Sequence, residues 1–464
     1  MLTGPLLKKL LLFSLPLMAS NVLQLLFNAA DVVVVGRYAS YTSLAAVGST
    51  SSIVNLIVNL LIGIAVGVNV VIARYLGESG KEKEIARAVH TAVAVALVGG
   101  ALLGAIGILL SDAMLQMVKT PEDIFPLSRT YLHIYFAGTP GVMLYNYGAA
   151  ALRARGDTRR PLLFLTISGI VNVALNLYFV IVFQMDVAGV ALATIISEYL
   201  SAMLIMVCLI RAQDELHFSW RRLCIDWGSL RKMAHVGIPA GVQSCLFSLS
   251  NVAIQGAVNS YGGIVMAGCS AASSIEGFIY VSMNAFHHAA QTFISQNIGA
   301  GQYERVRPIL RKCILCTVIT GALLCVVTLV FDERLLRIYN RDPDVIAAGV
   351  EHLYIVASLY IVFGIADVLI GSIRGCGYPV TPVVINLLGT CVFRLIWIAA
   401  LDTNTLPVGW VYASYPISWV LIAAALIVFW RYLYSRKLRP EIATNGCVYD
   451  AESRVYPPDR RVRK

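Results

Sequence analysis

Twelve apolar runs of membrane-spanning length constrain the fold of this chain more than any other feature. A helix needs about 20 apolar residues to cross a bilayer. Only 13% of the 464 residues are charged, about half the share typical of soluble domains. We therefore expect an all-α membrane protein of twelve transmembrane helices without a separate soluble domain. The candidate spans lie near residues 13–35, 44–73, 88–110, 131–152, 161–183, 188–210, 236–258, 264–294, 312–331, 350–373, 383–401 and 408–430.

The placement of Lys and Arg predicts the orientation of these spans. Basic residues gather on the cytoplasmic side of membrane proteins. With twelve spans, 29 of the 36 basic residues fall on one side, together with both termini. We expect a multi-pass protein of the bacterial inner membrane with both termini cytoplasmic. The opposite side holds Arg37, Lys119, Arg129, Arg334, Arg337 and Arg341, and Arg394 lies within a span.

The first apolar run follows the basic pair Lys8-Lys9, as the apolar core of a signal peptide does. The run continues through Val35 without a small-residue cleavage site. This pattern predicts an uncleaved first transmembrane helix.

The two halves of the chain repeat one another. Pro16, Asn28 and Tyr38 align with Pro239, Asn251 and Tyr261, and the offset drifts by only two residues as far as Arg153 and Arg374. Because each half has an even number of spans, the halves enter the membrane in the same direction. The predicted units are a first half (1–210), a cytoplasmic connection (211–235), a second half (236–435) and a disordered basic cytoplasmic tail (436–464).

Several motifs together resemble the MATE (multidrug and toxic compound extrusion) family, in particular its bacterial DinF-like branch. They are NAADVVVVGRY (28–38), LGESGKEKEIARA (76–88), LRARGDTRRP (152–161), NVALNLYFVI (172–181), GVALAT (189–194) and ISQNIGAGQYERVR (294–307). The resemblance covers residues 10 to 435. It implies an ion-coupled exporter that works by alternating access.

Asp31 is the strongest candidate for coupling an ion to transport. A charge at the bilayer centre costs about 2.5–3.5 kcal/mol, so an acidic residue there needs a partner or a function. Asn28 precedes Asp31 by one turn on the same helix face. The family resemblance implies that the first-helix Asp acts in ion coupling and that Pro16 allows this helix to bend. The alternative is that Asp31 only holds helices together through permanent hydrogen bonds.

Asn172 and Asn176 are four residues apart, which places both amides on one face of the fifth span. Their oxygens could bind a cation or hydrogen-bond to Asp31. Several family members have Asp where this chain has Asn176, so a two-carboxylate Na⁺ site in this half is in doubt. By resemblance, the hydroxyl of Thr194 completes the cluster. Ordinary interhelical hydrogen bonding is the alternative.

The second half contains its own acidic residues at membrane depth, Glu276 and Asp367. Either could form a second ion site or a counter-charge for a cationic substrate. Alternatively, their role is structural, and Arg394 forms an ion pair with one of them.

Other classes of site are not indicated. The chain has no P-loop, H-E-x-x-H or G-x-S-x-G motif, so we expect no enzyme activity, nucleotide or cofactor other than a coupling ion. Cys313 and Cys316 lack a second ligand pair, and His287 and His288 are adjacent and diverge, so no metal site is expected. The net charge of +10 fits contact with anionic lipid rather than nucleic acid. We expect a monomer.

The sequence therefore predicts an antiporter that exports organic, cationic and lipophilic compounds in exchange for H⁺ or Na⁺. A flippase for a lipid-linked saccharide is the nearest alternative, but a single membrane-depth arginine is unfavourable for an anionic pyrophosphate lipid. A membrane-embedded receptor or enzyme without transport is the alternative of another class.

Overall fold

A computed structural model describes residues 1–38, 41–118, 120–401 and 406–442. Within this part of the chain the secondary structure is helical, without strands. The first half comprises α1 (Leu6–Tyr38), α2 (Tyr41–Gly77), α3 (Glu82–Met117), α4 (Phe125–Ala137), α5 (Thr139–Arg155), α6 (Arg159–Leu177) and α7 (Asp186–Ile210). The second comprises α8 (Trp227–Asn259), α9 (Gly263–Gly299), α10 (Val306–Val330), α11 (Asp332–Tyr339), α12 (Pro343–Ala357), α13 (Tyr360–Gly375), α14 (Val380–Asn386), α15 (Phe393–Ala400) and α16 (Gly409–Leu433).

The predicted all-α membrane fold is confirmed, although two of the predicted spans are broken. Ten continuous helical stretches of the described residues are long and apolar enough to cross a membrane. Helices α12 and α13, bent by 47° at their junction, pass the same test as a pair and make eleven if they are counted as one span. The predicted span at 131–152 falls across α4 and α5, which have 13 and 17 residues. Each is shorter than the roughly 20 residues that a straight crossing requires. Gly138 separates them, and Pro140 lies in the first turn of α5, where proline is tolerated.

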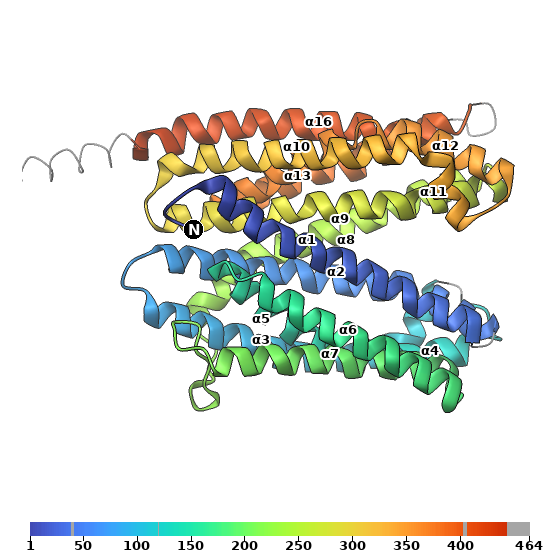
Figure 1. Cartoon of the computed structure of the whole chain (residues 1–464), viewed down its shortest axis with the longest axis horizontal. Helices are drawn as coiled ribbons and strands as arrows, with labels where there is room; N and C mark the ends of the chain where they lie inside the picture. The colour runs from blue at the N-terminus through green and yellow to red at the C-terminus, as the bar shows by residue number, and fades with distance from the viewer. Residues whose placement is uncertain (39–40, 119, 402–405, 443–464) are drawn as a thin grey trace, which may run out of the picture.

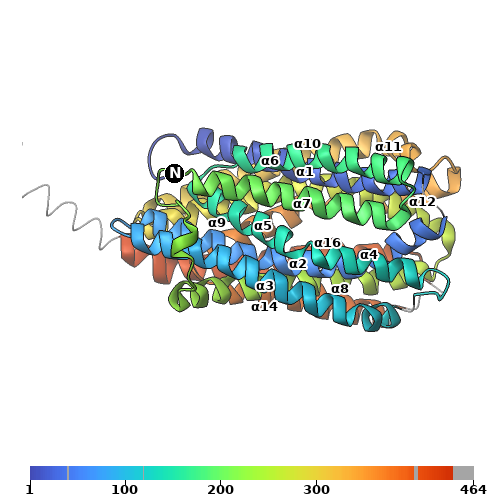
Figure 2. The same cartoon turned by 90° about the horizontal axis from the view of Figure 1, so that it is seen from below.

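The helices form two bundles that lie one above the other in Figure 1 and overlap in Figure 2. Helices α2 to α7 form the first bundle and α9 to α16 the second, while α8 packs against both, on α2 and α3 and on α14 and α15. Helix α1 runs obliquely between them (Figure 1). Its residues Leu10, Phe13 and Leu17 pack in the core of the second bundle, whereas Val34 and Val35 pack in the first. The first turns of α1 thus belong to the other half's core.

Helices α2 and α8 cross closely at the centre of the interface between the bundles. A Cβ atom added at Gly63 of α2 would lie 2.2 Å from Gly241 Cα of α8. One added at Gly67 would lie 2.1 Å from the carbonyl oxygen of Met233. Only glycine permits such an approach of two backbones, so these residues set the distance between the halves.

Both described ends of the chain lie at the same end of the bundles, which we call the terminal end (Figure 1). There the last turns of α2 and α9 meet. A Cβ at Gly77 would lie 2.0 Å from Gln296 O, and one at Gly299 would lie 2.1 Å from Arg74 O. The bundles are therefore in contact at the terminal end in this conformation.

Asn69 joins the two bundles by hydrogen bonds just inside the terminal end. Its Oδ1 atom accepts from Thr292 Oγ1 at 2.9 Å and from Gln291 Nε2 at 3.3 Å. Its Nδ2 atom donates to Ala150 O at 3.1 Å. Ser295 Oγ donates to Val70 O at 2.7 Å in the next turn. This side-chain network holds α2 against α9 in a buried interface.

Replacing Asn69 with alanine is expected to destabilise this conformation, since it leaves three buried polar groups without their partners. The expected loss is about 1–3 kcal/mol, measured as a lower thermal unfolding midpoint in detergent. Asn59→Ala is the matched control, because Asn59 donates one hydrogen bond, to Ser248 Oγ at 3.2 Å, beside a cavity. Equal midpoints for the two variants would contradict the role of Asn69.

The predicted cytoplasmic connection is an ordered segment packed on the first bundle. Phe218 is fully buried, the backbone N–H of Ser219 donates to His90 Nε2, and that of Asp226 donates to Thr91 Oγ1. Helix α8 begins within the predicted connection, at Trp227, where Asp226 caps it.

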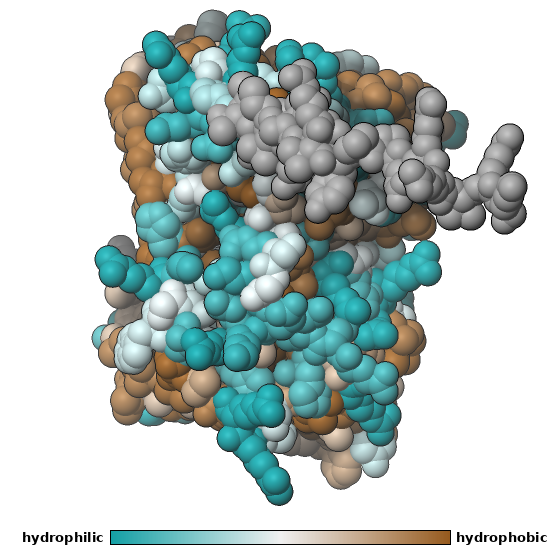
Figure 3. All heavy atoms as spheres, turned by 90° about the vertical axis from the view of Figure 1, so that its left-hand side faces the viewer, coloured by the Kyte–Doolittle hydropathy of each residue, from teal (hydrophilic) through white to brown (hydrophobic). Residues whose placement is uncertain are grey.

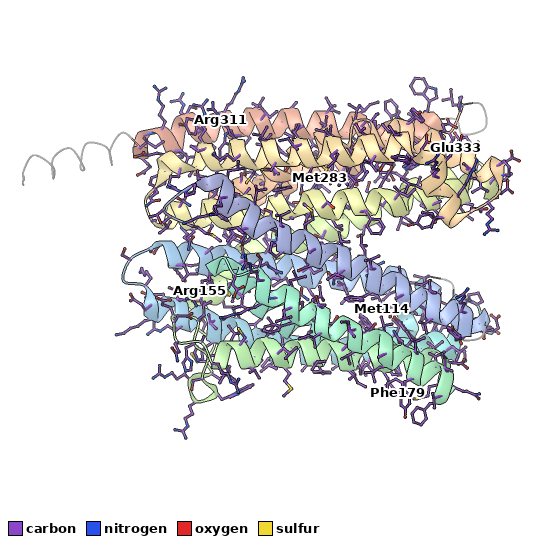
Figure 4. The ribbon with its side chains drawn as sticks, viewed as in Figure 1. Met114, Arg155, Phe179, Met283, Arg311 and Glu333 are labelled. Carbon is purple, nitrogen blue, oxygen red and sulfur yellow. The ribbon has the colours of Figure 1, made fainter. Side chains whose placement is uncertain are left out.

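Residues 436–442 of the predicted tail are helical, because a π-helical segment, Tyr434–Leu438, follows α16 and the helical stretch continues to Ile442. Residues 443–464 lie outside the described part of the chain. Figure 3 shows hydrophilic side chains gathered over the terminal end, with hydrophobic ones along its flanks. Arg155 and Arg311 lie at this end, and Phe179 and Glu333 lie at the opposite one (Figure 4).

Candidate functional site

A cavity of about 950 Å³ lies between the two bundles, on the side of the α2–α8 crossing away from the terminal end. Its walls come from α2, α3, α8, α9, α13, α14 and α16. Apolar, methionine and aromatic side chains dominate, including Met114, Phe363 and Trp419. Amides and hydroxyls interrupt this surface, and Asp367 is the one charged residue among those that line it. The cavity can therefore bind an organic molecule with apolar surface and a few polar groups.

Asp31 lies in a polar cluster at the junction of α1 and α6, outside the set of residues that line the cavity. Asn176 Nδ2 donates to Asp31 Oδ1 and also lies 3.3 Å from Asn172 Oδ1. Both asparagines are buried, and Asp31 is half-buried. The structure thus brings together three of the five residues predicted for ion coupling. Asn176 Oδ1 is buried without a hydrogen-bond partner.

The other two predicted residues do not join this cluster in the observed conformation. Asn28 is exposed on α1. Thr194 Oγ1 donates to Val190 O of its own helix at 2.9 Å. Pro16, the predicted bend, lies inside the continuous helix α1, where Ser20 Oγ donates to its carbonyl oxygen at 3.0 Å.

In the second bundle Asp367 lies between the cavity and α9. Its Oδ1 atom is 2.9 Å from His287 Nδ1, and its Oδ2 atom accepts from Asn284 Nδ2 at 3.0 Å. The carboxylate therefore has a histidine ring as its partner. His287 is also near the backbone oxygen of Asp367, at 2.8 Å.

Glu276 also has a histidine partner, at some distance along α9. Its Oε1 atom lies 3.1 Å from His352 Nε2, and both side chains are buried. The His352 ring packs at 4.4 Å from the ring of Tyr412. The sequence analysis predicted neither His287 as the partner of Asp367 nor His352 as the partner of Glu276. His352 is an ionisable residue within a predicted span, which is the signal that could have identified it.

The structural alternative, in which Arg394 pairs with Glu276 or Asp367, is not what the described residues show. Arg394 is fully buried, its Nε atom donates to Ser418 Oγ at 2.9 Å, and its guanidinium lies 4.5 Å from the centre of the Tyr415 ring. Because each carboxylate already has an imidazole beside it, the arginine is left with a hydroxyl and an aromatic face. No group of three or more potential metal ligands occurs among the described residues.

Comparison with known proteins gives a consistent picture. A family model described as MatE matches residues 16–178 and 239–398. The chain is 30% identical to "Probable multidrug resistance protein YpnP" of Bacillus subtilis (strain 168), over 84% of this chain and 87% of that protein. It is 25% identical to the "FAD transporter" of Shewanella oneidensis, over 96% and 98% respectively. Its fold is similar to a solved structure titled "Outward-facing conformation of a multidrug resistance MATE family transporter of the MOP superfamily", with a TM-score of 0.87 and 19% identity over 95% of this chain and 98% of that one.

Proposed function

This chain belongs to the MatE family, and from that premise we propose that it is an antiporter that exports organic compounds in exchange for H⁺. The observation that carries the proposal is the separation of two sites. An organic-binding cavity lies between the bundles, while the Asp31 cluster lies outside its lining. Antiport requires two ligands that bias the conformations oppositely, and separate sites allow each to do so without sharing a volume.

The conformation supports an alternating-access cycle. The bundles touch at the terminal end through Gly77 and Gly299, and the cavity lies beyond the crossing of α2 and α8. We propose that the terminal end is cytoplasmic, in a bacterial inner membrane, because basic residues concentrate there. The conformation described here would then be closed to the cytoplasm.

Proton coupling is favoured by the way Asn176 faces Asp31. Asn176 presents its N–H to the carboxylate rather than its oxygen. A Na⁺ ion would require oxygen ligands from Asn176 and Asn172, so it would have to displace this hydrogen bond. A proton needs only a lone pair of the carboxylate. Asn28 and Thr194 would act in another conformation of α1 and α7, with Pro16 allowing α1 to bend.

The cavity supports a lipophilic cation as substrate. Aromatic rings such as those of Phe363 and Trp419 attract cations through their faces, and Asp367 supplies the negative charge. Methionine side chains adapt to ligands of different shape. No Lys or Arg occurs among the residues that line this cavity, which is unfavourable for the pyrophosphate of a lipid-linked saccharide, the alternative cargo.

The decisive experiment uses purified protein in proteoliposomes loaded with ethidium, a fluorescent lipophilic cation. A pH gradient and a Na⁺ gradient are imposed separately. We expect efflux with the pH gradient alone and none with the Na⁺ gradient alone. The reverse result would replace H⁺ by Na⁺ as coupling ion. Absence of ethidium efflux under both gradients, with transbilayer movement of a lipid-linked saccharide, would favour the flippase.

A further inference from the structure

Two carboxylate–imidazole pairs connect α9 to the broken span formed by α12 and α13. Glu276 of α9 faces His352 of α12 at 3.1 Å, and His287 of α9 faces Asp367 of α13 at 2.9 Å. The order is reversed between the pairs, since α9 supplies the acid in one and the base in the other. Met283, in the middle of the second bundle in Figure 4, lies between them on α9. The 47° bend of the broken span lies between the two contacts.

The Glu276–His352 pair is enclosed by weakly polar groups from each neighbouring element. Cys269 of α9 and Tyr412 and Tyr415 of α16 face His352. Cys325 of α10 and Tyr360 of α13 face Glu276. Arg394 of α15 lies over the Tyr415 ring, and Glu351, next to His352 on α12, interacts with Tyr412. Helix α11 packs on α12 through Leu336 against Gly349. Glu276 is 9% exposed and His352 is 2% exposed.

In such surroundings the charge of the pair depends on one proton. When one proton is added to the neutral imidazole, the resulting imidazolium and the carboxylate neutralise each other. Removing that proton leaves a buried carboxylate beside a neutral ring, and adding a second leaves a buried imidazolium beside a neutral acid. Either change exposes an uncompensated charge to a low-dielectric interior, which weakens the contact.

The location of the pair determines what that proton controls. His352 lies five residues before the end of α12 at Ala357, and α13 begins at Tyr360. The pair therefore lies where the shorter segment of the span meets α9, beside the break. The Asp31 cluster lies in the other bundle and contributes no contact to it.

We propose that Glu276 and His352 form a second proton-binding site, whose single proton holds α12 against α9. Loss of this proton releases α12 at its break with α13. The site extends the proposed antiport to a second titrating position, in the half of the molecule that forms most of the cavity wall. Its ligand is a proton rather than a metal ion, because the part of the chain that the structure describes holds no group of three or more potential metal ligands.

The test is hydrogen–deuterium exchange, read by mass spectrometry, on the full-length protein in lipid nanodiscs at pH 6 and pH 9. Labelling times are adjusted for the intrinsic pH dependence of exchange. We expect protection of residues 343–357 to be about tenfold or more lower at pH 9. In Glu276→Gln and His352→Gln this difference should disappear, with protection low at both values.

His133→Gln is the matched control, because His133 lies in α4, the corresponding segment of the first half, and contacts Ser111 Oγ at 2.8 Å. It should retain the pH difference in α12. A difference that persists in Glu276→Gln and His352→Gln would overturn the proposal. So would a difference lost in Asp31→Asn, since the titrating group would then be Asp31. None of these outcomes depends on ethidium transport, so failure of the antiport proposal is separately visible.

Discussion

Asp31→Asn is expected to abolish ethidium efflux driven by a pH gradient while leaving expression and folding intact. Asparagine has nearly the same shape as aspartate, and its oxygen can still accept the hydrogen bond that Asn176 donates to Asp31. The variant removes the only carboxylate of the α1–α6 cluster. Without a group that exchanges a proton there, the gradient no longer biases the two conformations. The measurement is dye efflux from proteoliposomes with matched protein content.

Asp112→Asn is the control for removal of a carboxylate from the same bundle. Asp112 lies on α3, where it contacts Arg129 at 3.0 Å and is partly exposed. A surface ion pair of this kind contributes at most about 1 kcal/mol, so efflux should persist. Unchanged efflux in Asp31→Asn would refute the assignment of the coupling site to Asp31. Binding of ethidium itself, followed by fluorescence, should be similar in both variants because neither residue lines the cavity.

Gly77→Ala is expected to shift the protein away from the conformation that is closed at the terminal end. The added Cβ would lie 2.0 Å from Gln296 O, a backbone atom that cannot rotate away. Overpacking of this kind costs about 1–3 kcal/mol, which corresponds to a change of roughly 5- to 150-fold in the conformational equilibrium. Gradient-driven efflux should fall accordingly, because the cycle must pass through this closed conformation.

The shift can be measured directly by alkylation of native cysteines, mapped by mass spectrometry. Cys376 is buried next to Gly377, where an added Cβ atom would lie 3.1 Å from Arg74 Nη1 of the first bundle. Its alkylation should accelerate in Gly77→Ala, whereas that of Cys313, buried inside the second bundle, should not. Gly256→Ala is the matched control, because nothing lies within 4 Å of a Cβ added at Gly256. Equal rates of Cys376 alkylation in the two variants would contradict the prediction.

The candidate ion site was only partly predictable from sequence. The spacing of Asn172 and Asn176 placed both amides on one face of α6, because helical geometry is local. That Asn176 rather than Thr194 meets Asp31 depends on how α1, α6 and α7 are rotated against one another. Asn28 illustrates the same limit, since it shares a helix with Asp31 but is exposed.

The partners of the second-half acids show the limit more sharply. The sequence offered Arg394 as one alternative partner for these acids, whereas His287 and His352 take that place. A sequence shows that a buried carboxylate needs a partner. It does not show which of several basic side chains the tilt of the helices brings within 4 Å.

By itself the sequence determined the membrane-spanning helical fold and the family, because apolar length and motifs are properties of consecutive residues. The repeat of the halves was visible for the same reason. Only the tertiary structure decided where α1 crosses from one bundle to the other, where two spans break, and which acid meets which base. Those features depend on contacts between helices far apart in the chain, and such contacts are set by the packing of whole helix faces.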